Sequence, residues 1–574
     1  MKLTKITVSN YRNLNDITIT LNTDCNYIIG ENNLGKSNLL SLLTAVFGGK
    51  SIDDKDYLDP DKPVDITLEI KLLPNEIGFF GDNFSPDDSS LIRIRYFKLI
   101  GEAYPTVVSA DTNEAIQIKH LRKMNFMKYE TTAVPGKELR IDGQRGAGLL
   151  VCGIIERFVN NSEPNLEFLE QEQVSSLIEY INNRLNKIKA FREHSISATF
   201  STNPTEMLSS MLYLSDGERK IDTTGSGVQY LAMASINTLC QIMELYKSKS
   251  NPFSDLLYTN DEGEKILPLV LAIDEPEVHL NPYLQRSLIG YYRKILSNGD
   301  DEFTELLRLC FGIDGIDGQL IVVTHSTDVL VGDYRNIVRF YRRDDKINAV
   351  SGADITLTDS IEKHLLMSFK EVKEAFYSKC VIFVEGATEY GCIHNFAEKL
   401  GVSLDDCGIC VISANGEKSI KQLRTLLSKF AIPSIAVYDG DVGNREVNDI
   451  DFYTVEVCFE VEIVKTLYTN NEIALVKTIV EEIDNNADVT ILDEDFVRKP
   501  FKKMEMDLNL YAPKRLSDVD EADEVGFCSM YAAWLFVKKG IILGRIVGDI
   551  IPVNLIPQCY KDAIIKAKDV AASG

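Results

Sequence analysis

The sequence predicts an α/β protein made of two successive domains with largely parallel sheets, followed by a helical C-terminal region. A short apolar strand at 27–29 runs through a glycine-rich turn into a helix. A continuous apolar run at 266–273 is typical of a strand that is buried on both faces. Further along, short apolar runs at 380–384, 409–412 and 434–438 alternate with helical stretches, which is the pattern of a second parallel sheet.

Length and composition are those of a multidomain globular protein. A chain of 574 residues with 45% hydrophobic and 26% charged residues is too long for one core and too apolar for long disorder. The formal net charge of -25 repels polyanions at long range, so nucleic acid must be bound through a local basic groove or through metal ions. Neither a signal peptide nor an apolar run of roughly 18 residues is present, and we expect a cytoplasmic protein with no membrane partner.

The cysteines do not predict a metal site. Among 11 cysteines, only Cys407 and Cys410 have CxxC spacing, and the chain holds only six histidines. A zinc site would need further ligands, so we expect ordinary reduced thiols at the start of a buried strand.

The elements of the first domain follow from alternation and helical periodicity. Alternating apolar residues at the N-terminus and at 64–110 predict half-buried strands in an antiparallel layer. The stretch 155–195 has apolar residues spaced by three and four, which predicts a small helical insertion that makes a dimer contact. A strong helix is expected at 229–246, and 350–375 is expected to be a linker.

The glycine-rich turn has the spacing of a P-loop. Its sequence GENNLGKS matches G-x-x-x-x-G-K-[ST] between a strand and a helix. The glycines let backbone N–H groups surround phosphate oxygens, Lys36 reaches the β and γ phosphates, and Ser37 holds Mg²⁺. We therefore expect ATP to bind here. The residues assigned to this turn are Gly30, Asn33, Gly35, Lys36 and Ser37.

Two carboxylates follow the apolar run at 266–273. Asp274 is expected to bind magnesium through its hydration shell, and Glu275 to orient and deprotonate the attacking water. Adjacent carboxylates are usually a solvated turn, but the long apolar strand directly before them favours the catalytic interpretation.

The following segments resemble those of ABC-type ATPases. EVHLNP at 277–282 is similar to the segment after their second Walker motif, and His325 in VVTHS resembles their switch histidine, which contacts the γ-phosphate. These ATPases complete the site with a signature loop from a second subunit, which implies at least a homodimer. Two segments resemble that loop, LSDGE at 214–218 and GSGVQ at 225–229, and we prefer the second because it directly precedes a helix. Its assigned residues are Gly225, Ser226, Gly227 and Gln229.

Carboxylates also end the strands of the second predicted sheet. Glu385 follows the run at 380–384, and Glu389 lies one helical turn later. Asp439 and Asp441 follow the run at 434–438 and share one side of an extended segment. Carboxylates at adjacent strand ends repel one another unless hard divalent cations neutralise them, so we expect Mg²⁺ or Mn²⁺ here.

This pattern resembles the TOPRIM domain of topoisomerases, primases and OLD nucleases, over about 375–470. The resemblance implies two metal ions about 4 Å apart, which activate water and stabilise the leaving 3′ oxygen. OLD proteins add a second acidic pair, and Glu460 with Glu462 is the nearest match, although Glu456 is an alternative. They also have a catalytic lysine, for which Lys539 in KKG is the nearest match.

A basic and aromatic stretch at 498–503 and 511–515 follows these motifs. In an acidic chain, such a cluster is a candidate phosphate track for DNA, and a solvated basic loop is an equal alternative.

Together, the motifs resemble the OLD (overcoming lysogenization defect) family, including the Gabija-type anti-phage nucleases. The resemblance implies an ABC-type P-loop ATPase domain at 1–150 and 206–350 with a helical insertion at 151–205. It further implies a Rossmann-like TOPRIM domain at 370–480 and a helical C-terminal part at 481–574. The implied activity is an ATP-regulated, metal-dependent DNA endonuclease in anti-phage defence. The implied assembly is a homodimer or homotetramer, acting alone, with a UvrD-like helicase or with another defence partner such as a retron.

Two other functions fit parts of the sequence. A topoisomerase uses the same acids with a tyrosine in a separate DNA-gate domain, and too little chain remains after about 470 for such a domain. An ATP-driven DNA clamp or repair mediator without nuclease activity would lack the acids, yet Glu385, Asp439 and Asp441 are all present.

Overall fold

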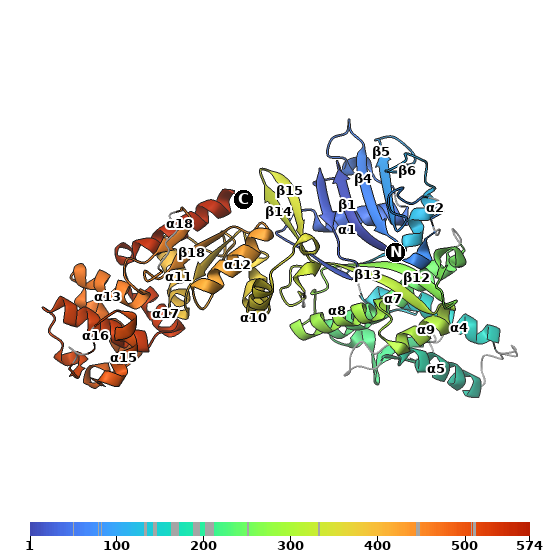
Figure 1. Ribbon diagram of the computed structural model, residues 1–574. Helices are drawn as coiled ribbons and strands as arrows, with labels where there is room; N and C mark the ends of the chain where they lie inside the picture. The colour runs from blue at the N-terminus through green and yellow to red at the C-terminus, as the bar shows by residue number, and fades with distance from the viewer. Residues whose placement is uncertain are drawn as a thin grey trace. The chain divides into compact units, whose positions relative to one another are not determined.

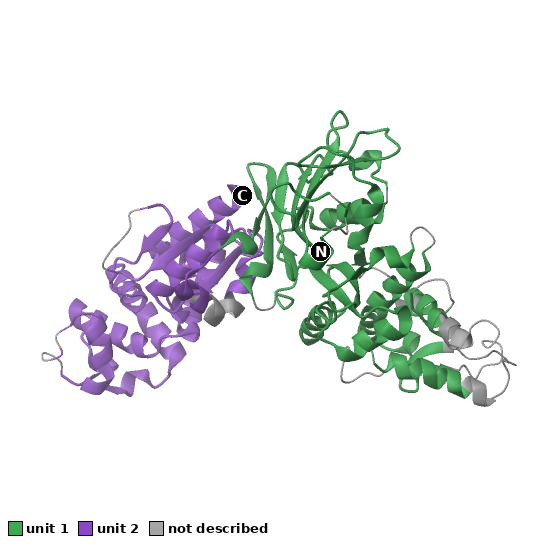
Figure 2. Cartoon of the chain, turned by 45° about the vertical axis from the view of Figure 1, so that its right-hand side comes forward, with its two compact units in different colours: residues 1–355 green, residues 356–574 purple. Residues whose placement is uncertain are grey.

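The computed structural model divides into two compact units, Met1–Ile355 and Thr356–Gly574 (Figure 2). The residues that it describes are 1–49, 51–77, 80–81, 83–130, 135–141, 146–161, 171–187, 196–200, 212–248, 252–330, 333–442, 448–506, 508 and 512–573.

A seven-stranded sheet forms the centre of the first unit. Its order is β11-β12-β13-β3-β14-β15, and β7 also pairs with β12. The inner strands are parallel, whereas β11 and β15 pair antiparallel at the edges. The strands are β3 (Cys25–Ile29), β7 (Phe126–Glu130), β11 (Tyr258–Thr259), β12 (Lys265–Asp274), β13 (Gly315–Val323), β14 (Ile337–Arg343) and β15 (Lys346–Ser351). Because β3 is buried along its whole length and β12 at eight of its ten residues, their sequences read as continuous apolar runs.

A five-stranded antiparallel sheet, in the order β2-β1-β4-β5-β6, confirms the alternation seen in the sequence. Its strands are β1 (Lys2–Ser9), β2 (Ile17–Thr20), β4 (Val64–Lys71), β5 (Leu91–Lys98) and β6 (Thr106–Ser109). Residues of β4 alternate between buried and less buried, and those of β1 do so except at an irregularity in its pairing between Leu3 and Lys5, as expected for a sheet with one face on the core.

Helix α1 (Lys36–Gly48) lies between the two sheets, and Leu39, Leu43 and Phe47 share one core with residues of both. The other face of the central sheet is covered by α7 (Ser226–Lys247), α8 (Pro282–Leu296) and α9 (Asp301–Phe311) (Figure 1). The expected helix at 229–246 is thus confirmed as part of α7. The first unit also contains the short helices α2 (Ile118–Leu121) and α3 (Pro135–Glu138).

The insertion is only partly helical, which corrects the prediction. Helices α4 (Gly146–Asn161) and α5 (Gln171–Leu185) are present, but β8 (Ile196–Phe200), β9 (Leu212–Asp216) and β10 (Arg219–Lys220) form a separate three-stranded sheet. The apolar residues with helical spacing continue to Ile188, whereas α5 ends at Leu185. Residues 162–170, 188–195 and 201–205, which belong to the predicted insertion, lie outside the described residues.

The predicted linker at 350–375 is also wrong for most of its length. The units divide after Ile355, and helix α10 (Asp359–Ala375) belongs to the second unit. Val372, Ala375 and Phe376 are fully buried, and Phe376 meets Phe430 edge-on at 5.1 Å. This segment therefore has an apolar face to bury, which a linker lacks.

The second unit is built on a parallel sheet in the order β17-β16-β18-β19. Its strands are β16 (Cys380–Val384), β17 (Ile409–Ser413), β18 (Ser434–Tyr438) and β19 (Asp451–Tyr453). Helices α11 (Ala387–Lys399) and α12 (Glu417–Lys429) connect the first three strands. Cys410 lies within β17, and Cys407 lies just before it.

The C-terminal region is helical, as predicted. It consists of α13 (Phe459–Thr469), α14 (Ile473–Ile483), α15 (Glu494–Lys503), α16 (Glu524–Val537), α17 (Ile541–Ile550) and α18 (Gln558–Ser573), with a small pair β20 (Ile491–Leu492) and β21 (Lys514–Arg515). No helix in the described part of the chain is long and apolar enough to cross a membrane.

Glycines let α17 approach α11 closely. A Cβ on Gly544 would lie 1.9 Å from the carbonyl oxygen of Thr388, and one on Gly391 would lie 2.4 Å from that of Ile541. This close packing fixes the start of α17 beside the first turn of α11, which carries Glu389.

Candidate functional site

The P-loop turn links β3 to α1 in a conformation that requires glycine. Gly30 has φ 135° and Gly35 has φ 82°, and a Cβ on Gly30 would lie 2.2 Å from the Phe340 carbonyl oxygen. Asn33 also has a left-handed φ of 63° and is exposed. The buried Lys36 donates from Nζ to the Gly30 carbonyl oxygen at 2.8 Å. Burial lowers the pKa of Lys36 to about 8, so an anionic phosphate would relieve the cost of its charge.

The structure brings Ser37 and Asp274 together. Ser37 Oγ donates to Asp274 Oδ1 at 3.1 Å, which is the arrangement expected of two groups that would hold one nucleotide-bound Mg²⁺. Lys128 Nζ lies 3.5 Å from Asp274 Oδ2. Sequence reasoning missed Lys128, because only the parallel pairing of β7 with β12 brings it to this site and no local motif marks it.

Glu275 and His325 face each other across the ends of β12 and β13. His325 Nε2 lies 4.0 Å from Glu275 Oε1, and Glu275 has an unusual φ of 53°. Burial lowers the pKa of His325, and the nearby Lys36 charge lowers it further. The imidazole is therefore neutral near pH 7, so one of its nitrogens can donate a hydrogen bond to a bound ligand and the other can accept one.

Glu277 holds the histidine loop in place, a role the sequence did not reveal. Its carboxylate accepts from the Thr324 hydroxyl at 2.8 Å and from the His325 backbone N–H at 2.6 Å. In the sequence, Glu277 was marked only by its position in EVHLNP. That segment indicated the resemblance to ATPases but not the contacts of Glu277 with Thr324 and His325.

The two candidate signature segments have different structures. LSDGE at 214–218 lies on β9 and the hairpin turn to β10. GSGVQ at 225–229 begins α7, and Gly225 and Ser226 are exposed there. Gln229 Nε2 donates to the carbonyl oxygens of Asp222 at 3.1 Å and Thr224 at 3.0 Å, which fixes the approach to the helix. Only the second segment presents a helix N-terminus, which suits contact with a phosphate.

In the second unit, the predicted acids gather at the ends of β16 and β18. Glu385 Oε1 accepts from the Asp439 backbone N–H at 3.0 Å. Glu389 and Glu460 are 7% and 4% exposed, and they come from the first turns of α11 and α13. Burial, together with the neighbouring carboxylates, raises the pKa of Asp439 to about 8 and that of Glu389 to about 7. Burial also raises the pKa of Glu385.

The second acidic pair is divided between two roles. Glu460 lies near enough to Glu389 and Asp439 to raise their pKa values. Glu462 instead accepts from the Glu456 backbone N–H at 2.8 Å, while Glu456 Oε2 lies 2.7 Å from Lys465 Nζ. The structure therefore joins Glu460 to the cluster and leaves Glu462 and Glu456 in a neighbouring network.

Two lysines carry positive charge near the acids. The charge of Lys539 offsets part of the rise in the pKa of Glu389 that burial and Glu460 cause, and the adjacent Gly540 N–H donates to Thr388 Oγ1 at 3.0 Å. Lys503 Nζ lies 3.8 Å from Asp439 Oδ2 and also pairs with Asp441. Lys538 pairs with Asp484 at 3.4 Å, whereas Lys539 Nζ lies 4.3 Å from the centre of the Phe536 ring, and Lys539 is the lysine of this segment whose charge acts on Glu389.

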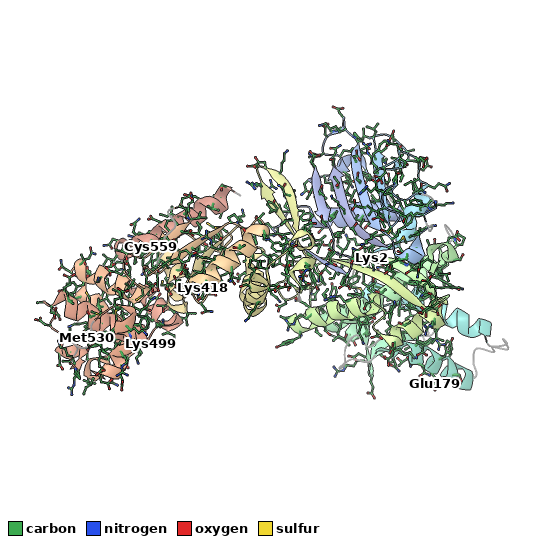
Figure 3. All side chains as sticks on the ribbon, viewed as in Figure 1. Lys2, Glu179, Lys418, Lys499, Met530 and Cys559 are labelled. Carbon is green, nitrogen blue, oxygen red and sulfur yellow. The ribbon has the colours of Figure 1, made fainter. Side chains whose placement is uncertain are left out.

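The predicted phosphate track needs correction at Lys503. Its amine is directed to the carboxylates of the cluster, and Arg498 pairs with Glu494 and Asp495 on the same helix. Lys499 remains exposed on α15 (Figure 3). Tyr511, the aromatic member of the track, lies outside the described residues.

The donor set suits a hard divalent cation, since it consists of carboxylates from four separate elements. The residues that could hold one are Glu385, Glu389, Asp439, Asp441 and Glu460. Within the described residues, however, no three Asp, Glu, His or Cys side chains are already arranged to hold a metal ion. Lys503 bonded to Asp441 is one reason, because that carboxylate faces an ammonium.

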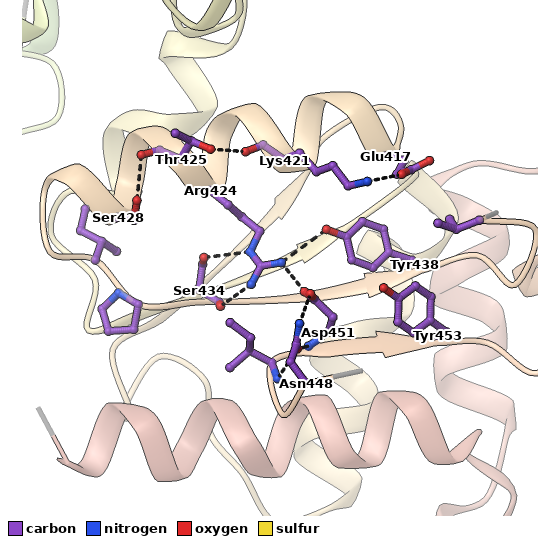
Figure 4. A pocket seen from close by; sticks show the side chains of 14 residues that line it. Glu417, Lys421, Arg424, Thr425, Ser428, Ser434, Tyr438, Asn448, Asp451 and Tyr453 are labelled. Atoms are coloured by element: carbon purple, nitrogen blue, oxygen red, sulfur yellow. Dashed lines mark hydrogen bonds and ion pairs between the residues drawn. The ribbon is translucent and has the colours of Figure 1, made fainter. Parts of the chain in front are cut away.

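A cavity of about 490 Å³ lies between α12 and the strands β18 and β19, and none of the clustered acids lines it (Figure 4). Arg424 lies in it, pairs with the buried Asp451 and donates to the Tyr438 hydroxyl at 3.4 Å. Lys421 pairs with Glu417 at 2.6 Å. The charges that line this cavity are therefore matched within it.

Comparisons with known proteins match both units. The AAA ATPase domain model matches residues 1–139 and 154–330, and the overcoming lysogenization defect protein-like TOPRIM domain model matches 376–441. The chain is similar to the Old nuclease of Escherichia phage P2, with 21% identity over 498 residues, or 77% of each chain.

Solved structures with similar parts include an SMC head domain from Thermotoga maritima, with 12% identity over 62% of this chain and 100% of that chain at TM-score 0.30. They also include the C-terminal region of the Xanthomonas campestris pv. campestris OLD protein, with 20% identity over 35% of this chain and 96% of that chain at TM-score 0.22.

Proposed function

Because the chain belongs to the OLD family, with an AAA ATPase domain before an OLD-like TOPRIM domain, we propose that it is an ATP-regulated, divalent-metal-dependent DNA endonuclease. The observation that supports this most is a cluster of carboxylates, of which Glu389 and Glu460 are buried and Glu385 and Asp439 are half-buried. Lys503 lies beside this cluster, and the charge of Lys539 acts on it. Buried like charges destabilise a fold, so their presence is best explained by a cationic ligand.

In the proposed reaction, the acids hold the cations and the lysines assist the phosphate. Divalent cations, when bound, supply an activated water and stabilise the leaving 3′ oxygen of a phosphodiester. Glu385, Asp439 and Asp441 are the proposed principal ligands, and Glu389 and Glu460 complete the oxygen shell. Lys539 offsets the negative charge that grows on the phosphate in the transition state.

In the first unit, Lys36 and Ser37 bind the phosphates and magnesium of ATP, together with Asp274. Glu275 orients and deprotonates the attacking water, and His325 contacts the γ-phosphate. The exposed signature segment at 225–229 is proposed to complete the site of a second copy, which makes the protein a homodimer or homotetramer. A strictly monomeric mass in light scattering, with and without ATP, would contradict this assembly.

A cleavage assay tests the nuclease function. We expect the purified protein to nick or cut plasmid or linear DNA with Mg²⁺ or Mn²⁺, and ATP to change the rate. Asp439→Ala should lower the rate by roughly a thousandfold or more, because it removes a cation ligand. Asp569→Ala, which changes an exposed acid of the same unit, is the matched control and should cut like the parent. Equal cutting by Asp439→Ala and the parent would exclude this cluster as the catalytic site.

We further propose a role in anti-phage defence, based on the resemblance to Gabija-type nucleases. Cells that express the protein should form fewer plaques on phage challenge than cells that express Asp439→Ala. Equal plaque counts over a broad phage panel would contradict the role without affecting the proposed activity.

A further inference from the structure

We propose that the first unit holds a second anion site, which binds the phosphate group of a small phosphorylated ligand such as a nucleoside monophosphate. The site is a cavity of about 420 Å³ at the C-terminal end of α1, beside β5 and α2. The P-loop lies at the opposite end of α1, about 20 Å away for a helix of this length. The two sites are therefore separate, and the proposal does not depend on the nuclease function.

Positive charge in this cavity is not matched by acidic groups. Lys98, Lys119 and Arg122 line it, and no Asp or Glu is among the described residues that do so. This is unusual in a chain with a net charge of -25. Glu102, in the neighbouring loop, accepts from the Leu99 backbone N–H at 3.0 Å.

Lys98 is the most deeply placed of the three cations. It is 6% exposed, and its Nζ donates to Ser51 Oγ at 3.1 Å and to the Ile52 carbonyl oxygen at 3.0 Å. Both acceptors are neutral, and no acidic side chain in the described part of the chain forms an ion pair with this ammonium. A buried ammonium without an anionic partner is unfavourable, and a bound anion would remove that cost.

Arg122 adds a second cation with unused hydrogen-bonding capacity. Its Nε is buried and has no hydrogen-bond partner in the described part of the chain. The guanidinium lies against the end of α1, where a Cβ on Gly49 would be 2.7 Å from Arg122 Nη2. Carbonyl groups at a helix C-terminus compensate about half a positive charge, which is insufficient for three cations.

The shape and lining of the cavity indicate the class of ligand. Its volume falls in the range of small-molecule sites, and a guanidinium with an ammonium is the pairing that binds phosphate in proteins. Tyr96, Tyr104 and Pro105 provide aromatic and apolar surface for the rest of the ligand. Because Lys98 lies deep in the cavity, a small ligand can reach it more easily than the phosphate backbone of a DNA duplex can. The position of Lys98 therefore favours a small ligand. The similarly sized cavity of Figure 4 differs, because its cations are paired with acids.

The test uses the full chain with Lys36→Ala, so that phosphate cannot act through the P-loop. Thermal unfolding and calorimetry would measure binding of inorganic phosphate, thymidine 5′-monophosphate and a short single-stranded oligodeoxynucleotide. Sodium chloride at equal ionic strength is the control for screening. We expect phosphate and the mononucleotide to bind and to raise the unfolding temperature. Binding of the oligonucleotide without the mononucleotide would overturn the small-ligand assignment, and no effect of any phosphate would overturn the site.

Two variants on different elements test the residues. Lys98→Met and Arg122→Gln, each in the Lys36→Ala background, should weaken phosphate binding about tenfold or more. Without ligand, each should unfold at the same or a higher temperature, because it removes an uncompensated charge. Lys421→Met is the matched control and should leave phosphate binding unchanged. Unchanged phosphate affinity in both variants would refute the proposal. If Lys98→Met fails to fold, Arg122→Gln alone decides the matter.

Discussion

Replacing Asp439 with asparagine is expected to make the metal-free protein more stable while it abolishes metal binding. Burial, together with Glu389 and Glu385, raises the pKa of Asp439 from 3.8 to about 8. A group whose folded pKa is raised contributes most to stability below its unfolded pKa, and that contribution is lost as the pH rises through the folded pKa. The parent should therefore lose stability between pH 4 and 8, and the uncharged variant should lose less.

The pKa shift sets the size of the effect. At about 1.4 kcal/mol per pH unit, a shift from 3.8 to about 8 has an upper bound of about 6 kcal/mol. Glu389 and Glu385 share the same repulsion and remain in the variant, so we expect about 2 kcal/mol to be recovered at pH 8. For a unit the size of Thr356–Gly574, this corresponds to a rise of about 4–8 °C in the unfolding temperature.

Thermal unfolding in a chelator from pH 5 to pH 8 measures the effect. The gap between variant and parent should widen with pH, and Mg²⁺ or Mn²⁺ should stabilise only the parent. Asp441→Asn is the matched control, since that carboxylate is 41% exposed and paired with Lys503, and it should give no stabilisation. If Asp439→Asn is less stable than the parent at pH 8 without metal, the charge repulsion inferred for this cluster is wrong.

Three further outcomes follow from single contacts. Lys36→Ala should abolish ATP binding in calorimetry with the circular dichroism spectrum retained, and unchanged affinity would refute the P-loop assignment. Gly544→Ala would place a Cβ 1.9 Å from the Thr388 carbonyl oxygen, so chemical denaturation should show a loss of about 1–3 kcal/mol in the second unit. An equally stable variant would show that α11 and α17 can separate freely. Lys503→Gln frees Asp441 and should tighten Mn²⁺ binding several-fold in a paramagnetic resonance titration. Weaker binding would instead place Lys503 among the groups that organise the site.

Features that depend on adjacent residues could be predicted from the sequence. The turn from Gly30 to Ser37 needs backbone conformations that favour glycine, and it ends at the start of a helix. Both requirements can be recognised from the types and spacing of adjacent residues. The acids at 385 and 439 follow strands whose burial on both faces makes them continuous apolar runs. Because parallel strands bring their carboxyl ends to one edge of the sheet, strand order was not needed to predict that these acids would be near each other.

Features that depend on long-range pairing could not be predicted. Lys128 reaches Asp274 only because β7 adds to β12, and its own surroundings in the sequence are unremarkable. From the sequence, Lys503 was predicted to be part of a basic surface. A run of cationic residues in a helix does not show in which direction any one side chain points. The same limit explains Glu462, whose partner is a backbone N–H on the segment before its own helix.

The P-loop of the first unit and the carboxylate cluster of the second bury charges of opposite sign. In both, the cost of the buried charge links the stability of the fold to ligand binding. In the first unit, burial opposes the charge of Lys36, and an anionic phosphate would restore the lost solvation. In the second, burial and repulsion oppose the charges of Asp439 and Glu389, and a cation would restore them. Each ligand binds only the folded form, so each stabilises its unit by an amount that grows with its concentration. The lysines beside the acids reduce this cost only in part, since Lys503 pairs mainly with Asp441 while Glu389 and Asp439 keep raised pKa values. A cluster fully neutralised by lysine would be more stable without metal and would bind metal less well. The incomplete compensation is therefore the feature that most favours a binding site over a structural ion-pair network.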